Sequence, residues 1–283
     1  MDTLVPKTDD SGDVVAPPAL KPPTLKLIVV PTTLSAAEYN VSSGATHPET
    51  RKKVLFTHPN CAPNCVILDP ELSTTTPQRL WLGTGMRAID HCVEALCTDL
   101  ATSMVEASAK EGLLNLVSGL LTSSADNMNV KARGKCQFGA WRAMEAVHQR
   151  VPLGASHAIG HHLGSVGGVP HGETSCVMLP AVMKYNRSVN GARQEKVAEI
   201  LWTVAGEAFE RAGLTYGRAD AGDLIKALVK ALGLPTTLRE VGVTDESQLD
   251  RIAEHTLTDV WAKTNPRSLD SKEQVREILR MAF

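Results

Sequence analysis

Apolar residues recur with helical spacing through most of the chain beyond residue 84. The clearest stripe falls on one face of a helix and consists of Leu113, Leu114, Val117, Leu120 and Leu121. Two shorter helices are marked by their ends: residues 223–232 stop before Gly233, and residues 274–281 begin behind Ser271 in a capping-box pattern. The pattern predicts a mainly helical domain over residues 81–283.

Short β-branched and aliphatic runs precede the helical part. Residues 25–30 and 66–68 each end in a turn, as buried strands do, and residues 54–56 form a weaker strand candidate. Residues 1–24 combine proline and aspartate with few large apolar groups, so we expect a flexible arm there. The predicted fold is an α/β fragment over residues 25–80, with a partial sheet, followed by the helical domain.

Composition is that of an ordinary globular protein. The 283 residues are 43% hydrophobic and 21% charged, and 29 basic against 31 acidic side chains give a net charge of -2. No stripe of lysine and arginine offers the footprint that phosphate backbones require, which argues against a DNA or RNA partner. The longest apolar run, residues 27–30, is too short for a membrane span, and the N-terminus lacks a secretory pattern. We therefore expect a cytoplasmic protein with no membrane partner.

The six cysteines have no zinc-ribbon spacing, because no pair is matched by a second pair at the required separation. In a reducing compartment we expect all of them to be buried thiols. They are Cys61, Cys65, Cys92, Cys97, Cys136 and Cys176.

Histidines gather in one stretch of the sequence. Four lie between residues 157 and 171, and His157 and His161 are four residues apart, so a helix would present both from one face. His171 follows, and His91 lies in a separate helical segment. Such imidazoles can converge either as ligands of a divalent metal or as a proton-transfer set. His162, on another face, is expected to pack or to face solvent.

The stretch from Gly154 to Asn186 resembles the signature of the iron-containing alcohol dehydrogenase superfamily, and other segments resemble its maleylacetate reductase branch. The matching pieces, in the family's order, are Val30-Pro31-Thr32-Thr33, Leu68-Asp69-Pro70, Gly85-Met86-x-Ala88-x-x-His91, His157-x-x-x-His161, Pro170-His171-Gly172, Leu232-Gly233-Leu234-Pro235 and Asn265-Pro266-Arg267. The resemblance implies a dehydroquinate-synthase-like fold in which residues 25–80 are part of a dinucleotide-binding domain.

The resemblance also implies roles for individual residues. In iron-dependent relatives one aspartate and three histidines hold the metal, and the histidine positions match His91, His157 and His171. His161 matches a family histidine linked to proton transfer. The aspartate position, however, is Arg87. A guanidinium stays protonated and donates no lone pair, so this substitution argues against Fe²⁺ or Zn²⁺ binding.

Two interpretations of Arg87 remain open. Maleylacetate reductases also depart from the aspartate and can work without metal, so Arg87 could replace the metal's electrostatic role by orienting a substrate carboxylate or polarising a carbonyl. Alternatively, Arg87 forms an ion pair with Asp90, three residues later, on the helix surface, where such a pair has little energetic weight.

The family's cofactor is NAD(P)H, whose pyrophosphate binds a Gly-Gly-Gly-Ser loop at a helix N-terminus. The sequence contains no such loop. Thr32 and Thr33 occupy the position where family members contact the cofactor. The alternative is a strand-end turn in which both hydroxyls are satisfied locally.

Three interpretations of the whole chain follow. It is an incomplete representation of a reductase, a shortened enzyme that performs histidine-based dehydration, isomerisation or lyase chemistry, or a non-catalytic remnant that serves as a binding or assembly partner. The functional prediction is an oxidoreductase that reduces a small keto or unsaturated carboxylic acid, with Arg87 and His161 as catalytic residues. An apolar, unpaired edge strand at residues 25–30 predicts a homo-oligomer or an aggregation-prone chain.

Overall fold

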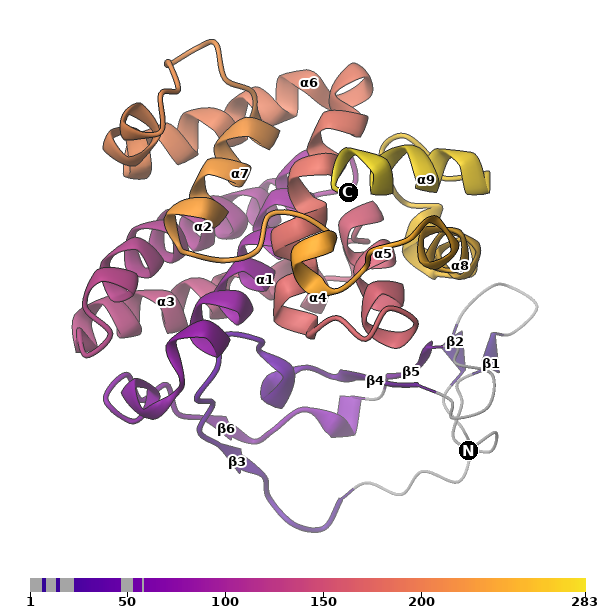
Figure 1. Ribbon diagram of the computed structural model, residues 1–283. Coiled ribbons are helices and arrows are strands. Elements are labelled where there is room, and N and C mark those ends of the chain that lie inside the picture. The colour runs from indigo at the N-terminus through magenta and orange to yellow at the C-terminus, as the bar shows by residue number, and fades with distance from the viewer. Residues whose placement is uncertain (1–6, 9–13, 16–22, 47–52, 58) are drawn as a thin grey trace.

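The computed structural model describes residues 7–8, 14–15, 23–46, 53–57 and 59–283. A helical body fills most of the molecule, and short strands lie along one side of it (Figure 1). The predicted fold class, an α/β fragment followed by a mainly helical part, is confirmed. The predicted flexible arm at residues 1–24 falls largely outside the described residues.

The strands form three separate pairs. The elements are β1 (Lys7–Thr8) with β2 (Val14–Val15), β3 (Ile28–Val29) with β6 (Cys65–Val66), and β4 (Ser42–Thr46) with β5 (Lys53–Thr57). The β3–β6 pair is parallel, with Ile28 opposite Cys65, whereas the other two pairs are antiparallel. Each predicted strand thus has a counterpart, but the paired part of residues 25–30 is only two residues long.

The β3–β6 pair leaves apolar side chains in solvent. Strand β3 is not unpaired as expected, because β6 covers one of its edges, and Ile67 N–H extends the ladder by donating to Val29 O at 2.9 Å. The prediction that residues 25–30 form a buried strand is wrong, since Leu25 is 84% exposed and Ile28 is 62% exposed. The sheet therefore leaves large apolar side chains in contact with water.

The helical body is built from long helices joined by short connections. Its α-helices are α1 (Gln78–Cys97), α2 (Ser103–Ala125), α3 (Val130–Ala143), α4 (Glu145–His148), α5 (Ala155–Ser165), α6 (His171–Arg211), α7 (Ala221–Ala231), α8 (Glu246–Thr256) and α9 (Lys272–Met281). Single 3-10 turns are η1 (Ala37–Tyr39), η2 (Pro59–Cys61), η3 (Leu72–Thr75), η4 (Arg239–Val241) and η5 (Val260–Ala262). None of the described helices is long and apolar enough to cross a membrane.

Helix α1 is the central element, because it packs against α2, α5 and α6 and is buried along nearly its whole length. Its start approaches α6 closely. A Cβ added at Gly172 would lie 3.0 Å from the carbonyl carbon of Gly83, so only glycine permits this backbone contact. The contact brings His171, the first residue of α6, next to the N-terminal half of α1.

Local sequence signals account for the predicted helix ends. Helix α7 starts from a capping box between Asp220 and Asp223 and ends before Gly233, whose φ of 68° is the left-handed conformation that glycine adopts at low cost. Helix α9 starts from the predicted capping box of Ser271 and Gln274. In α2, the predicted stripe faces the core, with three leucine and valine side chains fully buried and two half-buried.

The prediction that all six cysteines are buried is wrong for two of them. Cys61 and Cys65 are exposed, whereas the other four are buried free thiols in the helical body. The exposed pair lies in η2 and β6, where the small sheet is too thin to enclose its own side chains.

Candidate functional site

Helix α1 carries a polar stripe inside the core. Arg87, Asp90, His91 and Glu94 are spaced at i, i+3, i+4 and i+7, so all four lie on one face of the helix. Their exposed fractions are 4%, 0%, 9% and 5%. Because buried charges must be paired or hydrogen-bonded, this stripe requires partners on the neighbouring helices.

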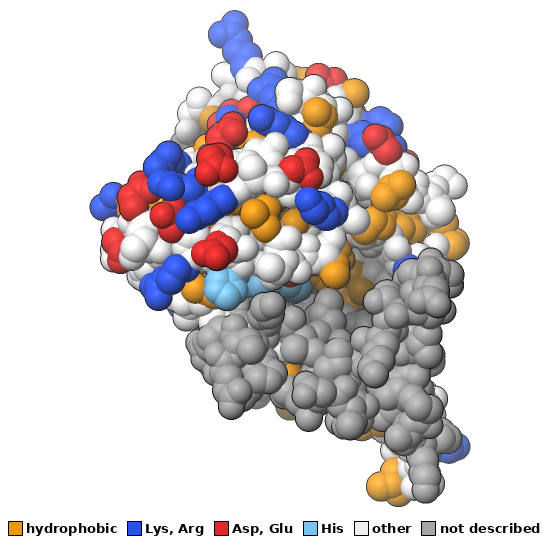
Figure 2. All heavy atoms as spheres, turned by 90° about the vertical axis from the view of Figure 1, so that its right-hand side faces the viewer, with side chains coloured by type: hydrophobic (Ala, Val, Ile, Leu, Met, Phe, Trp, Pro, Cys, Tyr) orange, Lys and Arg blue, Asp and Glu red, His pale blue; other side chains and the backbone are white. Residues whose placement is uncertain are grey.

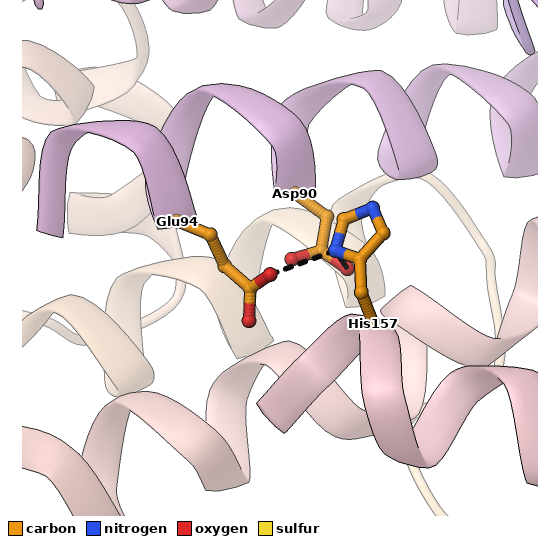
Figure 3. Close-up of side chains that lie close together, drawn as sticks. All are labelled: Asp90, Glu94 and His157. Atoms are coloured by element: carbon orange, nitrogen blue, oxygen red, sulfur yellow. Dashed lines mark hydrogen bonds and ion pairs between the residues drawn. The ribbon is translucent and has the colours of Figure 1, made fainter. Parts of the chain in front are cut away.

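Glu94 meets the start of α5 and positions its first histidine. The Glu94 carboxyl accepts the backbone N–H groups of Gly154 at 2.8 Å and of Ser156 at 2.9 Å, which are unpaired donors at a helix N-terminus. His157 Nδ1 lies 2.8 Å from the same carboxyl, and Figure 3 shows Asp90, Glu94 and His157 pointing toward one another from two helices. The His157 ring is therefore held in place by α1.

The four predicted histidines come together in space. His91 and His157 have ring centroids 4.5 Å apart, and His161 stacks over His171 at 6.2 Å. Trp261 links the two pairs, since its ring lies 5.6 Å from that of His157 and 5.0 Å from that of His161. We call His91, His157, His161 and His171 the histidine cluster.

The histidine cluster runs from the core to the surface. His157 is fully buried at one end, and His171 at the start of α6 is exposed at the other. Figure 2 shows histidine side chains reaching the surface at the lower margin of the helical body. The two ends of the histidine cluster therefore differ in their exposure to solvent.

Arg87 lies beside the histidine cluster with its guanidinium inside the protein. Its Nη1 donates to Ser175 Oγ at 3.2 Å and lies 3.7 Å from Asp90 Oδ2. Gly160 of α5 leaves room for it, because a Cβ there would lie 3.2 Å from Arg87 Nη1. The ion pair with Asp90 exists, but it is buried, so the interpretation of Arg87 as a surface pair is wrong.

The surroundings of the site favour a charged Arg87 and neutral imidazoles at His91 and His157. Burial, together with the neighbouring Arg87 charge, lowers the pKa of His91 to about 3 and holds the pKa of His157 well below its usual value. Burial also lowers the pKa of Arg87, but the carboxylates of Asp90, Glu94 and Asp259 oppose that shift, and a guanidinium keeps its proton. Both imidazoles are thus neutral at pH 7.

The two carboxyl groups of α1 are shifted toward their protonated forms. Burial raises the pKa of Asp90 to about 6, although Arg87 and hydrogen bonds from Ser175 and Ser156 oppose the shift. Burial and the neighbouring Asp90 charge raise the pKa of Glu94 to about 8. Asp90 and Glu94 are therefore easier to protonate than carboxyl groups in water.

Asp259 pairs with His161 from the opposite side. His161 Nδ1 lies 2.8 Å from Asp259 Oδ2, and the backbone N–H of Trp261 donates to Asp259 Oδ1 at 3.0 Å. His162, predicted to pack or face solvent, is buried, and its Nε2 lies 3.6 Å from Asp259 Oδ2. Sequence reasoning missed Asp259 and Glu94, whereas it considered Asp90 only as an ion-pair partner of Arg87.

The Thr32–Thr33 turn follows β3 and docks on α1. Thr84 Oγ1 of α1 accepts the backbone N–H of Leu34 at 3.2 Å, and Thr76 Oγ1 donates to Thr32 O at 2.7 Å. Thr33 Oγ1 lies 3.0 Å from Ser35 Oγ, as a locally satisfied turn would have it. The turn is thus anchored to α1 at Thr84, three residues before Arg87. It also lies at the carboxyl end of a parallel strand, which is where α/β sheets bind nucleotides.

Three buried side chains of the site form a group that could hold a metal ion. Ligand atoms of Asp90, Glu94 and His157 lie within 4.8 Å of one another. Both Glu94 oxygens, however, accept backbone N–H groups, and Arg87 places a fixed positive charge 3.7 Å from Asp90. The histidines that match family ligands, His91, His157 and His171, have Arg87 in place of the fourth ligand. A dication held by Asp90, Glu94 and His157 would have to compete with the Arg87 charge and with the hydrogen bonds that start α5.

Comparison with known proteins gives relatives along most of the chain. Dehydrogenase FUM7 of Gibberella moniliformis is 39% identical over 93% of this chain, and dehydrogenase ALT3 of Alternaria alternata is 38% identical over 93%. The chain spans 65% of the length of the first relative and 73% of the second.

Solved structures share the fold over the same region. Maleylacetate reductase from Rhizobium sp. strain MTP-10005 superposes with a TM-score of 0.76 at 26% identity, covering 91% of this chain and 67% of the reductase. Residues 82–283 match the Fe-containing alcohol dehydrogenase family, C-terminal part. On this match, and on the identity to its relatives, the chain belongs to the iron-containing alcohol dehydrogenase family.

Proposed function

We propose that the protein catalyses NAD(P)H-dependent reduction of a small keto or unsaturated carboxylic acid of the maleylacetate type. The observation that carries this proposal is the convergence of the histidine cluster beside the buried guanidinium of Arg87. The names of the relatives agree with it, since they include two dehydrogenases and a maleylacetate reductase.

Arg87 and His91 bind the acid in this proposal. Among the described residues, Arg87 donates one hydrogen bond, to Ser175, while a guanidinium carries five N–H groups, so donors remain for a carboxylate or a carbonyl oxygen. His91 is neutral and serves as a polar neighbour of that oxygen. His157 and His171 complete the polar wall on either side.

His161 supplies the proton. Reduction of a ketone adds a hydride to the carbonyl carbon and a proton to the oxygen, whereas reduction of a conjugated double bond adds the proton to the carbon next to the carboxylate. His161 is held by Asp259 through Nδ1, so Nε2 is the nitrogen that delivers the proton. After each turnover His161 regains a proton from solvent.

The nicotinamide cofactor would lie against the Thr32–Thr33 turn. Bound NAD(P)H would supply the hydride. The turn fits the nicotinamide end of such a cofactor, because its threonine side chains are half-buried and the backbone is anchored to α1 beside the histidine cluster. These two threonines orient the cofactor and keep it on the substrate side of α1.

The exposed apolar face of β3 and β6 supports a homo-oligomer. Leu25 and Ile28 are more than half exposed, and Ile67 adds to the same sheet. Association of two copies would remove this surface from water.

The proposal is tested with the 283-residue protein and variants that keep the fold. NAD(P)H oxidation is followed with keto and unsaturated dicarboxylic acids in the wild type, His161→Gln and Arg87→Lys. His161→Gln should lower kcat by a factor of about 10² to 10⁴. Arg87→Lys keeps the charge but loses the fork of donors, so it should raise KM for the acid more than it lowers kcat. Conversion of the acid without cofactor would instead establish the lyase or isomerase alternative.

A further inference from the structure

Asp259 contacts His161 from a distant part of the chain. It lies more than 90 residues away in sequence, at the entrance to η5, and only 6% of its side chain is exposed. Its two oxygens have different partners: Oδ1 accepts the N–H of Trp261, and Oδ2 faces His161 Nδ1 at 2.8 Å. The carboxylate is therefore fixed by the η5 backbone before it contacts the imidazole.

We propose that Asp259 is the positioning residue of the proton donor: it fixes the His161 ring and the tautomer that carries the proton on Nδ1. This inference rests on the proposed function only for its kinetic consequence. A carboxylate can only accept, so the 2.8 Å contact requires Nδ1 to carry a hydrogen. A neutral His161 then presents its unprotonated Nε2, the nitrogen that can receive and return a proton.

The surroundings of Asp259 favour the ionised carboxylate that this role needs. Burial alone raises the pKa of Asp259, but hydrogen bonding to His161 and the charges around it hold that pKa below its usual value. The groups that face Asp259 are His161 and His162 of α5, the Trp261 N–H of η5 and, at longer range, Arg87 of α1. All of these are donors or cations, so none competes with the acceptor role.

A purely structural role for Asp259 would give a different pattern of variants. As the N-cap of η5, Asp259 needs only one side-chain oxygen for the Trp261 N–H. Asparagine keeps that oxygen and the same shape, but it turns a donor toward His161 Nδ1 and so favours the opposite tautomer. Serine also keeps the cap but is too short to reach His161. Asp259→Asn and Asp259→Ser therefore separate the cap from the contact with histidine.

The experiment combines a tautomer readout with kinetics on the full chain. Protein labelled with ¹⁵N in histidine is compared by NMR between the wild type, Asp259→Asn and Asp259→Ser, and the His161 signals are identified by their loss in His161→Gln. His162→Gln is the matched control, because it removes the other imidazole that faces Asp259. We expect Nδ1 protonation in the wild type and in His162→Gln, and Nε2 protonation in Asp259→Asn. In the kinetic arm, Asp259→Asn should lose about 10²-fold in kcat at nearly constant KM.

Two results would overturn the assignment. One is a His161 tautomer that stays the same in Asp259→Asn. The other is a kcat in Asp259→Asn equal to that of the wild type, together with a lower kcat and a lower stability in Asp259→Ser. That result would leave Asp259 as a helix cap alone. If the wild type transfers no hydride to any acid, the proposed function fails on its own, and the NMR comparison still decides the role of Asp259.

Discussion

Replacing Arg87 by methionine tests whether the guanidinium is the counter-charge that lets Asp90 stay buried. Asp90 is fully buried, and its Oδ2 accepts hydroxyl groups of Ser156 at 2.7 Å and Ser175 at 2.5 Å, with Arg87 3.7 Å away. Methionine keeps most of the volume and removes the charge. Breaking a buried ion pair from one side costs about 3–5 kcal/mol, because the remaining charge is uncompensated.

The loss of folding free energy in Arg87→Met must depend on pH, because Asp90 becomes neutral when it takes up a proton. With Arg87 present, the pKa of Asp90 is already raised to about 6. A raised carboxyl pKa contributes stability that is present at low pH and lost as pH rises, so removal of Arg87 extends that loss above pH 6. Arg87→Met should therefore cost little near pH 5 and up to about 3 kcal/mol near pH 8, because proton uptake over the two pH units above a pKa of about 6 limits the loss to about 1.4 kcal/mol per unit.

Urea unfolding followed by circular dichroism at both pH values measures this cost in the wild type, Arg87→Met, Asp90→Asn and the double variant. The double variant should recover much of the loss at pH 8, since neither buried charge remains, whereas Arg87→Lys should lose less than Arg87→Met. Equal destabilisation by Arg87→Met at both pH values, or simple additivity of the two single substitutions, would refute the pairing.

Further predictions concern metal, packing, thiols and assembly. Arg87→Asp should create or strengthen Fe²⁺ or Zn²⁺ binding in metal analysis of the purified protein, and no gain would count against the alignment of His91, His157 and His171 with family ligands. Gly160→Ala should push the guanidinium aside, because the new Cβ would lie 3.2 Å from Arg87 Nη1, and so raise KM for the acid; an unchanged KM would place the acid elsewhere. A thiol reagent should label the two exposed cysteines of the native protein quickly and the four buried ones only on unfolding, and fast labelling of a third thiol would contradict the packing of the core. Sedimentation should show an oligomer or aggregate, and a monodisperse monomer with a high melting temperature would contradict the role given to the exposed sheet face.

The spacing of histidines predicted much of the site. His157 and His161 lie on one face of α5 as the four-residue separation requires, and the family resemblance supplied His91 and His171 from other helices. The helix ends at Gly233 and Ser271 were also predictable, because capping depends on a few neighbouring residues.

Of the three carboxylates at the site, the sequence indicated only Asp90, as an ion-pair partner of Arg87. Asp90 and Glu94 had a local signal: with Arg87 and His91 they form a polar stripe at i, i+3, i+4 and i+7 along α1. Asp259 had none, because its contact with His161 is set by how η5 packs on α5. A contact across more than 90 residues depends on tertiary packing, which periodicity does not describe.

The sequence predicted that strands form over residues 25–80, but not how short their paired parts are. Residues 25–30 have the composition of a buried strand, yet only Ile28–Val29 are paired and Leu25 is exposed. The length of a strand depends on its neighbours in the sheet, and the described residues provide β3 with β6 alone. The same thin sheet explains why Cys61 and Cys65 are not buried.

The central claim is hydride transfer to a small carboxylic acid at the histidine cluster. It is tested most directly by incubating the protein with maleylacetate-type acids and NAD(P)H deuterated at nicotinamide C4, followed by mass spectrometry of the product. We expect a product that carries one deuterium and forms only when the cofactor is present. A product without deuterium, or one that forms in the absence of cofactor, would contradict the claim.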